Sequence, residues 1–197
     1  MSKLILMIGI PGSGKSTWSS RYAQEHPGVS VVSSDGIRRE LSGTEEFDPD
    51  PAVNARVFAM VRARVSSGII KGDVIVDATN VHVRDWRQYI ELCPGGTDCR
   101  AVLFDVGPDE AMRRQEGRER KVPREVLERM WGAIGSNRGR IPEFFGRWLV
   151  IGEDGIVSEM KREQEIEDEE ARRDTGRDRG AEEGALGEGA EEGQVIC

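Results

Sequence analysis

A glycine-rich segment near the N-terminus has the residue types needed to hold phosphate groups. Residues 9–16 read Gly-Ile-Pro-Gly-Ser-Gly-Lys-Ser and match the G-x-x-x-x-G-K-[ST] pattern of a phosphate-binding loop. Glycines let backbone N–H groups turn inward around phosphate oxygens, and a following helix adds the positive end of its dipole. The lysine supplies a point charge for the β- and γ-phosphates, and the serine hydroxyl can bind Mg²⁺. The residues predicted to bind nucleotide here are Gly9, Gly12, Ser13, Gly14, Lys15, Ser16 and Thr17, with Lys15 also catalytic and Ser16 also a metal ligand.

A phosphate-binding loop is shared by motors, switches, carriers and kinases. The sequence contains no Asn-Lys-x-Asp segment, with which switch proteins read guanine, and 197 residues are few for a motor or a large ATPase. The class that remains is a small phosphotransferase, in which catalysis is mainly positioning and electrostatic stabilisation of the transferring phosphoryl group.

A kinase also needs a group that takes the proton of the attacking hydroxyl. Asp35 follows a predicted strand, and Arg38 lies three residues later, about one helical turn away on the same side. A carboxylate and a guanidinium so spaced can share one substrate, the first orienting a hydroxyl and the second holding a nearby anion. The alternative is structural: Asp35 caps a helix and Arg38 lies on the surface.

The elements that must position these residues alternate between strand and helix. Residues 4–10 form a continuous apolar run, as expected for a strand buried on both faces. Alternating strands and helices of this length predict an α/β fold with a mostly parallel sheet and helices on both faces. The predicted strands are 4–10, 29–32, 74–76, 101–106 and 148–151, and the predicted helices are 16–26, 35–41, 51–65, 84–92, 108 towards 117, and one that begins after 123.

The charge of the chain is concentrated in its C-terminal part. Residues 161–197 hold 6 basic and 13 acidic side chains, so they carry −7 of the total −8. The sequence therefore predicts a domain over 1–160 and an acidic, disordered tail over 161–197, either a solvated appendage or a docking segment.

The remaining composition limits the class of protein. No apolar run reaches 18 residues, so no membrane span is expected. Three cysteines cannot form a framework of bridges, and the two histidines are far apart, which excludes a zinc-ligand pattern. We expect a cytoplasmic protein with no membrane partner.

The N-terminal motifs resemble those of bacteriophage polynucleotide kinases and of the kinase domain of bacterial end-healing enzymes. The resemblance rests on residues 3–18, on the Pro27-Gly28 break, and on Asp35 followed by Arg38. It spans about Met1 to Ile151 and is weakest between Glu40 and Gly72. It implies the P-loop kinase fold, ATP and Mg²⁺ as cofactors, Asp35 as general base on a 5′-hydroxyl, and Arg38 as the contact to the phosphate 3′ of the acceptor nucleoside.

Two further segments are similar to that family. Val74-Ile-Val-Asp-Ala-Thr-Asn80 resembles the strand that ends in an Asp/Thr-Asn segment. By this likeness Asp77 holds a metal-bound water and Asn80 contacts substrate, although Asn80 can equally cap the next helix. Residues 114–123 resemble the arginine-bearing lid, placed at about 109–123, in which Arg114, Arg118 and Arg120 contact nucleotide and Arg118 is the transition-state arginine.

These observations predict ATP-dependent phosphorylation of the 5′-hydroxyl ends of DNA or RNA. No Asp-x-Asp-x-Thr phosphatase segment follows the kinase-like region, so a single activity is expected. Two alternatives remain open, namely a small-molecule or toxin-type kinase and a nucleotide-binding interaction protein.

Overall fold

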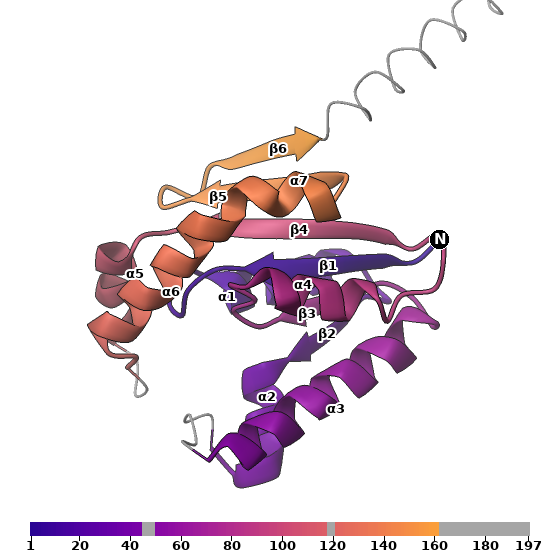
Figure 1. The fold of residues 1–197 in the computed structure, drawn as a ribbon, viewed down its shortest axis with the longest axis horizontal. Helices are drawn as coiled ribbons and strands as arrows, with labels where there is room; N and C mark the ends of the chain where they lie inside the picture. The colour runs from indigo at the N-terminus through magenta and orange to yellow at the C-terminus, as the bar shows by residue number, and fades with distance from the viewer. Residues whose placement is uncertain (45–49, 118–120, 162–197) are drawn as a thin grey trace, which may run out of the picture. The chain divides into compact units, whose positions relative to one another are not determined.

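A six-stranded sheet forms the centre of the protein (Figure 1). The structure is a computed structural model and describes residues 1–44, 50–117 and 121–161. The strand order is β2-β3-β1-β4-β5-β6, and every pairing is parallel except that between β5 and β6. β1 is therefore central, so the segment that follows it emerges in the middle of the carboxyl edge of the sheet. The strands are β1 (Lys3–Ile8), β2 (Ser30–Ser33), β3 (Val74–Asp77), β4 (Asp98–Asp105), β5 (Arg147–Gly152) and β6 (Val157–Lys161).

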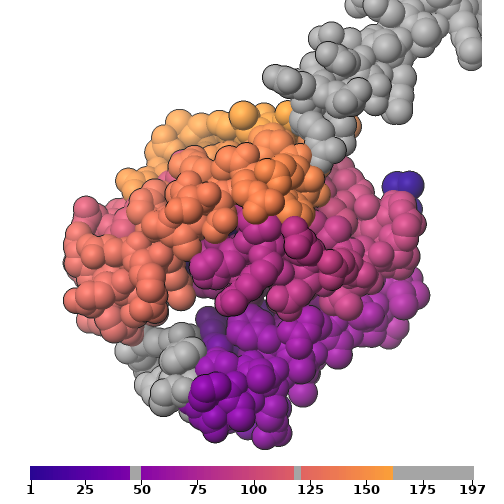
Figure 2. All heavy atoms as spheres, viewed as in Figure 1, coloured from indigo at the N-terminus to yellow at the C-terminus, as the bar shows by residue number. Residues whose placement is uncertain are grey.

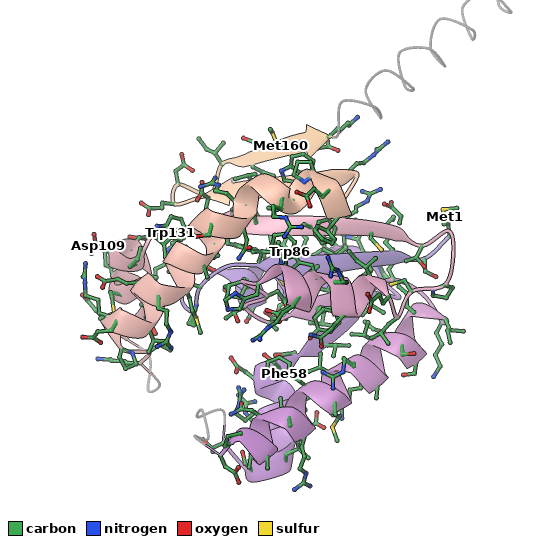
Figure 3. All side chains as sticks on the ribbon, in the orientation of Figure 1. Met1, Phe58, Trp86, Asp109, Trp131 and Met160 are labelled. Carbon is green, nitrogen blue, oxygen red and sulfur yellow. The ribbon has the colours of Figure 1, made fainter. Side chains whose placement is uncertain are left out.

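Helices cover both faces of this sheet, as the alternating pattern predicts. On β1, Leu4, Leu6 and Ile8 face a core shared with α3, α4, α6 and α7, whereas Ile5 and Met7 face a second core beside α1. Figure 3 labels Trp86 of α4, one of the largest fully buried side chains. The helices are α1 (Lys15–Glu25), α2 (Ser34–Ser42), α3 (Pro51–Ile69), α4 (Val83–Ile90), α5 (Pro108–Gln115), α6 (Arg124–Asn137), the 3₁₀ turn η1 (Arg138–Arg140) and α7 (Ile141–Phe144).

The predicted α/β architecture is confirmed, with differences at the ends of elements. The first strand ends at Ile8 rather than at Ile10, because Gly9 and Ile10 already belong to the loop. The helix predicted over 51–65 continues to Ile69, and β4 begins at Asp98, three residues before the predicted start.

One strand is absent from the prediction. β6 pairs antiparallel with β5, and the two are joined by a turn at Gly152–Ile156 that includes Asp154 and Gly155. All residues of β6 but the last are exposed, so apolar patterning gives no signal for this edge strand. The structure thus extends the sheet beyond the last predicted strand.

The described compact unit spans Met1–Lys161. The acidic tail predicted over 161–197 lies, apart from Lys161, outside the described residues. In the part of the chain that is described, no helix combines the length and the apolar character needed to cross a bilayer.

Candidate functional site

The phosphate-binding loop lies between β1 and α1, at the carboxyl edge of the sheet. Lys15 is buried, and its Nζ donates hydrogen bonds to the carbonyl oxygens of Gly9 (3.0 Å) and Ile10 (2.8 Å) and to Ser13 Oγ (3.4 Å). The ammonium group is thus held inside the curve of the loop. This is the position from which a lysine reaches the phosphates of a nucleotide seated in such a loop.

The start of α1 is suited to an anion. Gly14 is its N-cap, no side chain caps the helix, and no acidic residue lies in its first turn. The first intrahelical bond runs from the N–H of Trp18 to the carbonyl of Gly14 (3.1 Å), so the N–H groups of the first turn have no helical acceptor. Together with the helix dipole, these donors attract phosphate oxygens.

Two loop glycines adopt backbone angles that other residues rarely reach. Gly12 has φ +84° and Gly14 has φ +103°. A Cβ on Gly12 would lie only 2.8 Å from the carbonyl oxygen of Ala111, because α5 packs directly against the loop. The glycine requirement at Gly12 is therefore conformational and steric.

Asp77 is the last residue of β3 and lies beside the loop. Its side chain is buried beside Ser16 and Ser19 of α1. Burial raises the pKa of the Asp77 carboxyl, while the Ser16 hydrogen bond and the charge of Lys15 oppose that shift. The site thus holds a carboxylate and a hydroxyl beside the predicted phosphate position. These hard oxygen donors fit Mg²⁺, which takes one or two protein ligands and completes its shell with phosphates and water.

Asp35 and Arg38 form an ion pair on the first turns of α2. The distance from Arg38 Nη1 to Asp35 Oδ1 is 2.6 Å, and Arg38 Nη2 donates to Asn54 Oδ1 of α3 at 3.3 Å. Arg38 is only 5% exposed, and its buried Nε has no hydrogen-bond partner among the described residues. The Asp35 side chain is 51% exposed and lies close enough to Asp77 to raise the pKa of that carboxyl.

The structural alternative for this pair is wrong. The N-cap of α2 is Ser33, whose Oγ accepts a hydrogen bond from the N–H of Gly36 (3.2 Å), so Asp35 lies in the first turn and is not the cap. Arg38 is buried and is not a surface residue. The pair lies at the start of α2, directly after β2 at the carboxyl edge of the sheet.

Asn80 has a structural function that the sequence interpretation did not include. Its Nδ2 donates to the carbonyl of Met7 (2.7 Å), and its own carbonyl accepts from Trp86 Nε1 (2.7 Å). It does not cap the next helix, because the N-cap of α4 is His82. Asn80 has φ +46° and ties the end of β3 to β1 just before the loop, and its predicted contact with substrate stays a prediction.

Arg114 is the one predicted lid arginine among the described residues. Its Nη1 donates to the carbonyl of Ser13 (3.1 Å), its Nη2 to the carbonyl of Glu153 (2.8 Å), and its Nε to Glu110 (2.6 Å). It therefore contacts the backbone of the loop in this structure, and its predicted contact with nucleotide stays a prediction. Arg118 and Arg120, also predicted to contact nucleotide, lie outside the described residues.

The site includes residues that sequence reasoning missed. Ser19 lies one helical turn after Ser16 and adds a second hydroxyl to Asp77. Asn54 of α3 positions the Arg38 guanidinium, and Gln115 is buried and accepts from the N–H of Val122 at 2.9 Å. Only Ser19 had a signal in the sequence, the helical spacing from Ser16. The other two depend on contacts between separate elements.

Comparison with known proteins identifies relatives of this chain. The human heterogeneous nuclear ribonucleoprotein U-like protein 2 is 27% identical over 122 residues, which are 57% of this chain and 16% of the relative. Adenylate kinase from Natronomonas pharaonis is 31% identical over 127 residues, which are 58% of this chain and 56% of the relative. The chain thus spans about half or less of the length of these relatives.

Solved structures share the fold. A chain in the structure of the Pnkp1/Rnl/Hen1 RNA repair complex superposes with a TM-score of 0.64 at 22% identity, over 82% of this chain and 48% of that one. A second structure of the Pnkp1/Rnl/Hen1 complex matches at 27% identity with a TM-score of 0.52, over 61% of this chain and 43% of that one. A gluconokinase from Sinorhizobium meliloti 1021 has a TM-score of 0.52 at 17% identity, over 76% of this chain and 82% of that one.

The family model described as AAA domain matches residues 4–134, which include the loop, Asp35, Arg38 and Asp77. This range covers most of the described unit, and the superposition over 82% of this chain with a TM-score of 0.64 shows a shared fold. The chain belongs to the AAA domain family and has the α/β P-loop kinase fold, with the nucleotide-binding loop of a kinase-like domain.

Proposed function

We propose that this domain transfers the γ-phosphoryl group of ATP to the 5′-hydroxyl end of DNA or RNA, with Mg²⁺ as the metal. The observation that carries the proposal is the Asp35–Arg38 pair, placed beside Asp77 and the phosphate-binding loop. A half-exposed carboxylate next to a buried guanidinium suits an acceptor that has both a hydroxyl and an adjacent anion. A nucleotide with a 5′-hydroxyl and a 3′-phosphate is such an acceptor.

Each residue of the site has a chemical task in this reaction. Asp35 accepts the proton of the 5′-hydroxyl. The hydroxyl oxygen forms a bond to the γ-phosphorus, while the bond between the γ-phosphorus and the leaving ADP oxygen breaks. Lys15 and the first turn of α1 stabilise the charge on the phosphates. Ser16 and Asp77 would hold Mg²⁺, which neutralises phosphate charge. Arg38 holds the 3′-phosphate, and the predicted arginines Arg118 and Arg120 complete the nucleotide site.

The likeness to Pnkp1 structures supports an acceptor of this class. Both matches come from complexes of Pnkp1, Rnl and Hen1, one of them described as an RNA repair complex, and one match exceeds 25% identity. This chain covers less than half of each matched chain, so only the kinase-like reaction is carried over. The sequence has no phosphatase motif after this domain.

We assign the activity to the cytoplasm. Cys93 and Cys99 are free cysteines, which agrees with a reducing compartment.

The deciding experiment supplies γ-labelled ATP, Mg²⁺ and matched acceptors. A nucleoside 3′-monophosphate should be phosphorylated, whereas the bare nucleoside should be a much poorer acceptor because Arg38 then has no anion to hold. Oligonucleotides with a 5′-hydroxyl should be labelled, and the same oligonucleotides with a 5′-phosphate should not. Equal use of nucleoside and nucleoside 3′-monophosphate would contradict the role of Arg38.

A small-molecule kinase is the second candidate. The gluconokinase match covers 82% of that chain, so the present domain has nearly the extent of a complete metabolite kinase. Sugar acids and other common metabolites therefore belong in the acceptor panel. Labelling of one of these, with none of the 5′-hydroxyl acceptors used, would favour this candidate.

A nucleotide-binding interaction protein is the candidate of another class. Tight ATP binding without transfer to any acceptor in the panel would favour it over both enzymes.

A further inference from the structure

A cleft of about 550 Å³ opens beside the candidate site and is not used by the residues assigned above. It is lined by α3, by the segment between β3 and α4, by α4 itself and by α6, and its wall includes Thr79 and Asn80 shortly after Asp77. Figure 2 shows the surface hollowed between the orange residues of α6 and the violet residues of α2 and α3, with indigo atoms of the N-terminal segment visible inside. The cleft therefore adjoins the region where the reacting groups lie.

One face of α3 connects the cleft to the acceptor residues. Asn54, which bonds Arg38, is followed by Phe58 and Arg62 at intervals of four residues, so the three side chains lie on one face of the helix. Eight residues of helix span about 12 Å. Phe58 and Arg62 line the cleft, and Figure 3 labels Phe58 on this helix. An acceptor held by Arg38 can thus extend along α3 into the cleft.

The charge of the lining favours an anionic ligand. The lining contains three arginines, Arg62, Arg84 and Arg129, and one carboxylate, Asp85. The net charge of the lining residues is therefore +2 when His82 is neutral. Residues 1–160 carry a net charge of only −1, so the cleft is a local positive excess within a nearly neutral domain.

These arginines also differ from several other surface arginines. Arg64, Arg113, Arg124, Arg138 and Arg140 each have a carboxylate partner at 2.9 Å or less. In the cleft, Arg62 donates to the amide oxygen of Gln88 at 3.4 Å, and Arg84 is 3.5 Å from Asp85. Arg129 has no ion pair with any of the residues that the structure describes. Their guanidinium groups therefore retain donors for phosphate oxygens.

The apolar part of the lining suits nucleobases. Phe58 and Met130 face the cleft together with Val81 and Ala133. Stacking on an aromatic side chain combined with arginine contacts to the backbone is the usual way in which proteins bind single strands without reading their sequence. A small sugar acid would leave this apolar lining without a partner.

We propose that the cleft binds the single-stranded segment that follows the terminal nucleotide, with Arg62, Arg84 and Arg129 on its phosphates and Phe58 beneath a base. This inference rests on the proposed function and adds to it that the acceptor is a polynucleotide strand and not a mononucleotide. It also predicts that the end must be unpaired over these nucleotides, because a paired base cannot stack on Phe58.

The experiment separates binding from phosphoryl transfer. Fluorescence anisotropy with a labelled oligothymidylate that already carries a 5′-phosphate measures affinity without turnover. We expect the triple variant Arg62→Ala/Arg84→Ala/Arg129→Ala to bind at least 10-fold more weakly. A plot of the logarithm of the association constant against the logarithm of the salt concentration should have a slope that is shallower by about 2, because each of the three lost phosphate contacts contributes about 0.7. The matched control Arg21→Ala/Arg113→Ala/Arg140→Ala removes the same charge elsewhere and should change neither value.

Transfer assays then test the link to the reaction. In the triple variant the KM for a 5′-hydroxyl oligonucleotide should rise at least 10-fold, while the kinetics with a nucleoside 3′-monophosphate stay unchanged. Phe58→Leu should weaken oligonucleotide binding about 5-fold or more without changing the salt slope. The double variant Arg84→Ala/Arg129→Ala, which changes two exposed side chains, provides the same test if the triple variant unfolds.

The outcomes distinguish the two proposals. Unchanged binding in the triple variant, or an equal loss in the control, overturns the cleft proposal while leaving 5′-kinase activity intact. Absence of transfer to every 5′-hydroxyl acceptor, with binding still dependent on the three arginines, overturns the proposed function and leaves a single-strand-binding cleft.

Discussion

The proposed donor and acceptor halves of the site are built in different ways. The donor half consists largely of backbone: a loop with two left-handed glycines, the open first turn of α1, and a lysine held by loop carbonyls. The acceptor half consists of side chains from α2 and α3, joined through the Asp35–Arg38–Asn54 contacts. Backbone N–H groups bind phosphate oxygens whatever the rest of the ligand is. Side chains from two helices must fit one arrangement of hydroxyl and anion, so they can distinguish between acceptors.

Substitution of the proposed base should separate the two halves most strongly. We expect Asp35→Asn to lower kcat by roughly 10²–10⁴, because the hydroxyl loses its proton acceptor. ATP affinity should stay close to wild type, whereas the unfolding midpoint should fall, because the buried Arg38 guanidinium loses its carboxylate partner. Steady-state kinetics and nucleotide titration measure these effects, and a parallel loss of ATP binding would show that the halves are not separable.

Asp77 should show opposite effects on activity and stability. Asp77→Asn removes the proposed metal ligand, and we expect the Mg²⁺-dependent rate to fall by about 10²-fold or more. Because burial raises the pKa of this carboxyl, the ionised form destabilises the folded protein at neutral pH. The variant should therefore have a higher unfolding midpoint than wild type at pH 7.

The pH dependence of the stability gained in Asp77→Asn follows from the raised pKa of the Asp77 carboxyl. The advantage of Asp77→Asn should decline as the pH falls and vanish below the ordinary aspartate pKa of about 4, where the wild-type carboxyl is protonated in both states. Thermal unfolding from pH 3 to pH 8 measures it. A variant less stable than wild type at pH 7 would show that the serine and lysine contacts outweigh burial.

Two glycine substitutions compare the conformational and steric requirements of the phosphate-binding loop. Gly14→Ala should lower the free energy of unfolding by about 1–2 kcal/mol, the cost of a left-handed conformation. Gly12→Ala should cost about 1–3 kcal/mol more, because its Cβ also meets the Ala111 carbonyl. Denaturant unfolding of both variants provides the comparison, and equal losses would mean that α5 yields readily to the added methyl group.

The smallest expected effect concerns two neighbouring arginines of α5. Both bond Glu110 and lower its pKa to about 2, but only Arg114 reaches the loop, at the Ser13 carbonyl. Arg114→Ala should lower the free energy of unfolding by only about 1 kcal/mol, because water can replace its partly exposed contacts, and should raise the KM for ATP a few-fold. Arg113→Ala should leave both the unfolding midpoint and this KM unchanged, and a matching effect there would assign the loss to Glu110.

The sequence predicts the donor half better than the acceptor half for a physical reason. The loop is a contiguous motif, so Lys15 and Ser16 can be placed from local spacing alone. The partners of the acceptor residues come from elements that only the tertiary fold brings together, and nothing in the spacing indicates that Asn54 holds Arg38.

The fold is also predictable from local sequence patterns, except for the exposed edge strand β6. The buried strands contain continuous apolar runs, and the helices between them fix a parallel sheet. β6 has no such run and is absent from the prediction, although Asp154-Gly155 is a usual hairpin-turn dipeptide. Asn80 illustrates a further limit, because its left-handed backbone and its bond to Met7 depend on the packing of β3 against β1.

The Asn80 linkage has a mechanical consequence. It fastens the strand that carries Asp77 to the strand that leads into the loop, and the N–H of Gly9 adds a second tie to the Thr79 carbonyl at 3.0 Å. The metal and triphosphate positions therefore belong to one stiff block. α2 follows the edge strand β2 and lies outside this block, so we expect amide hydrogen exchange to slow in α2 first when both substrates bind.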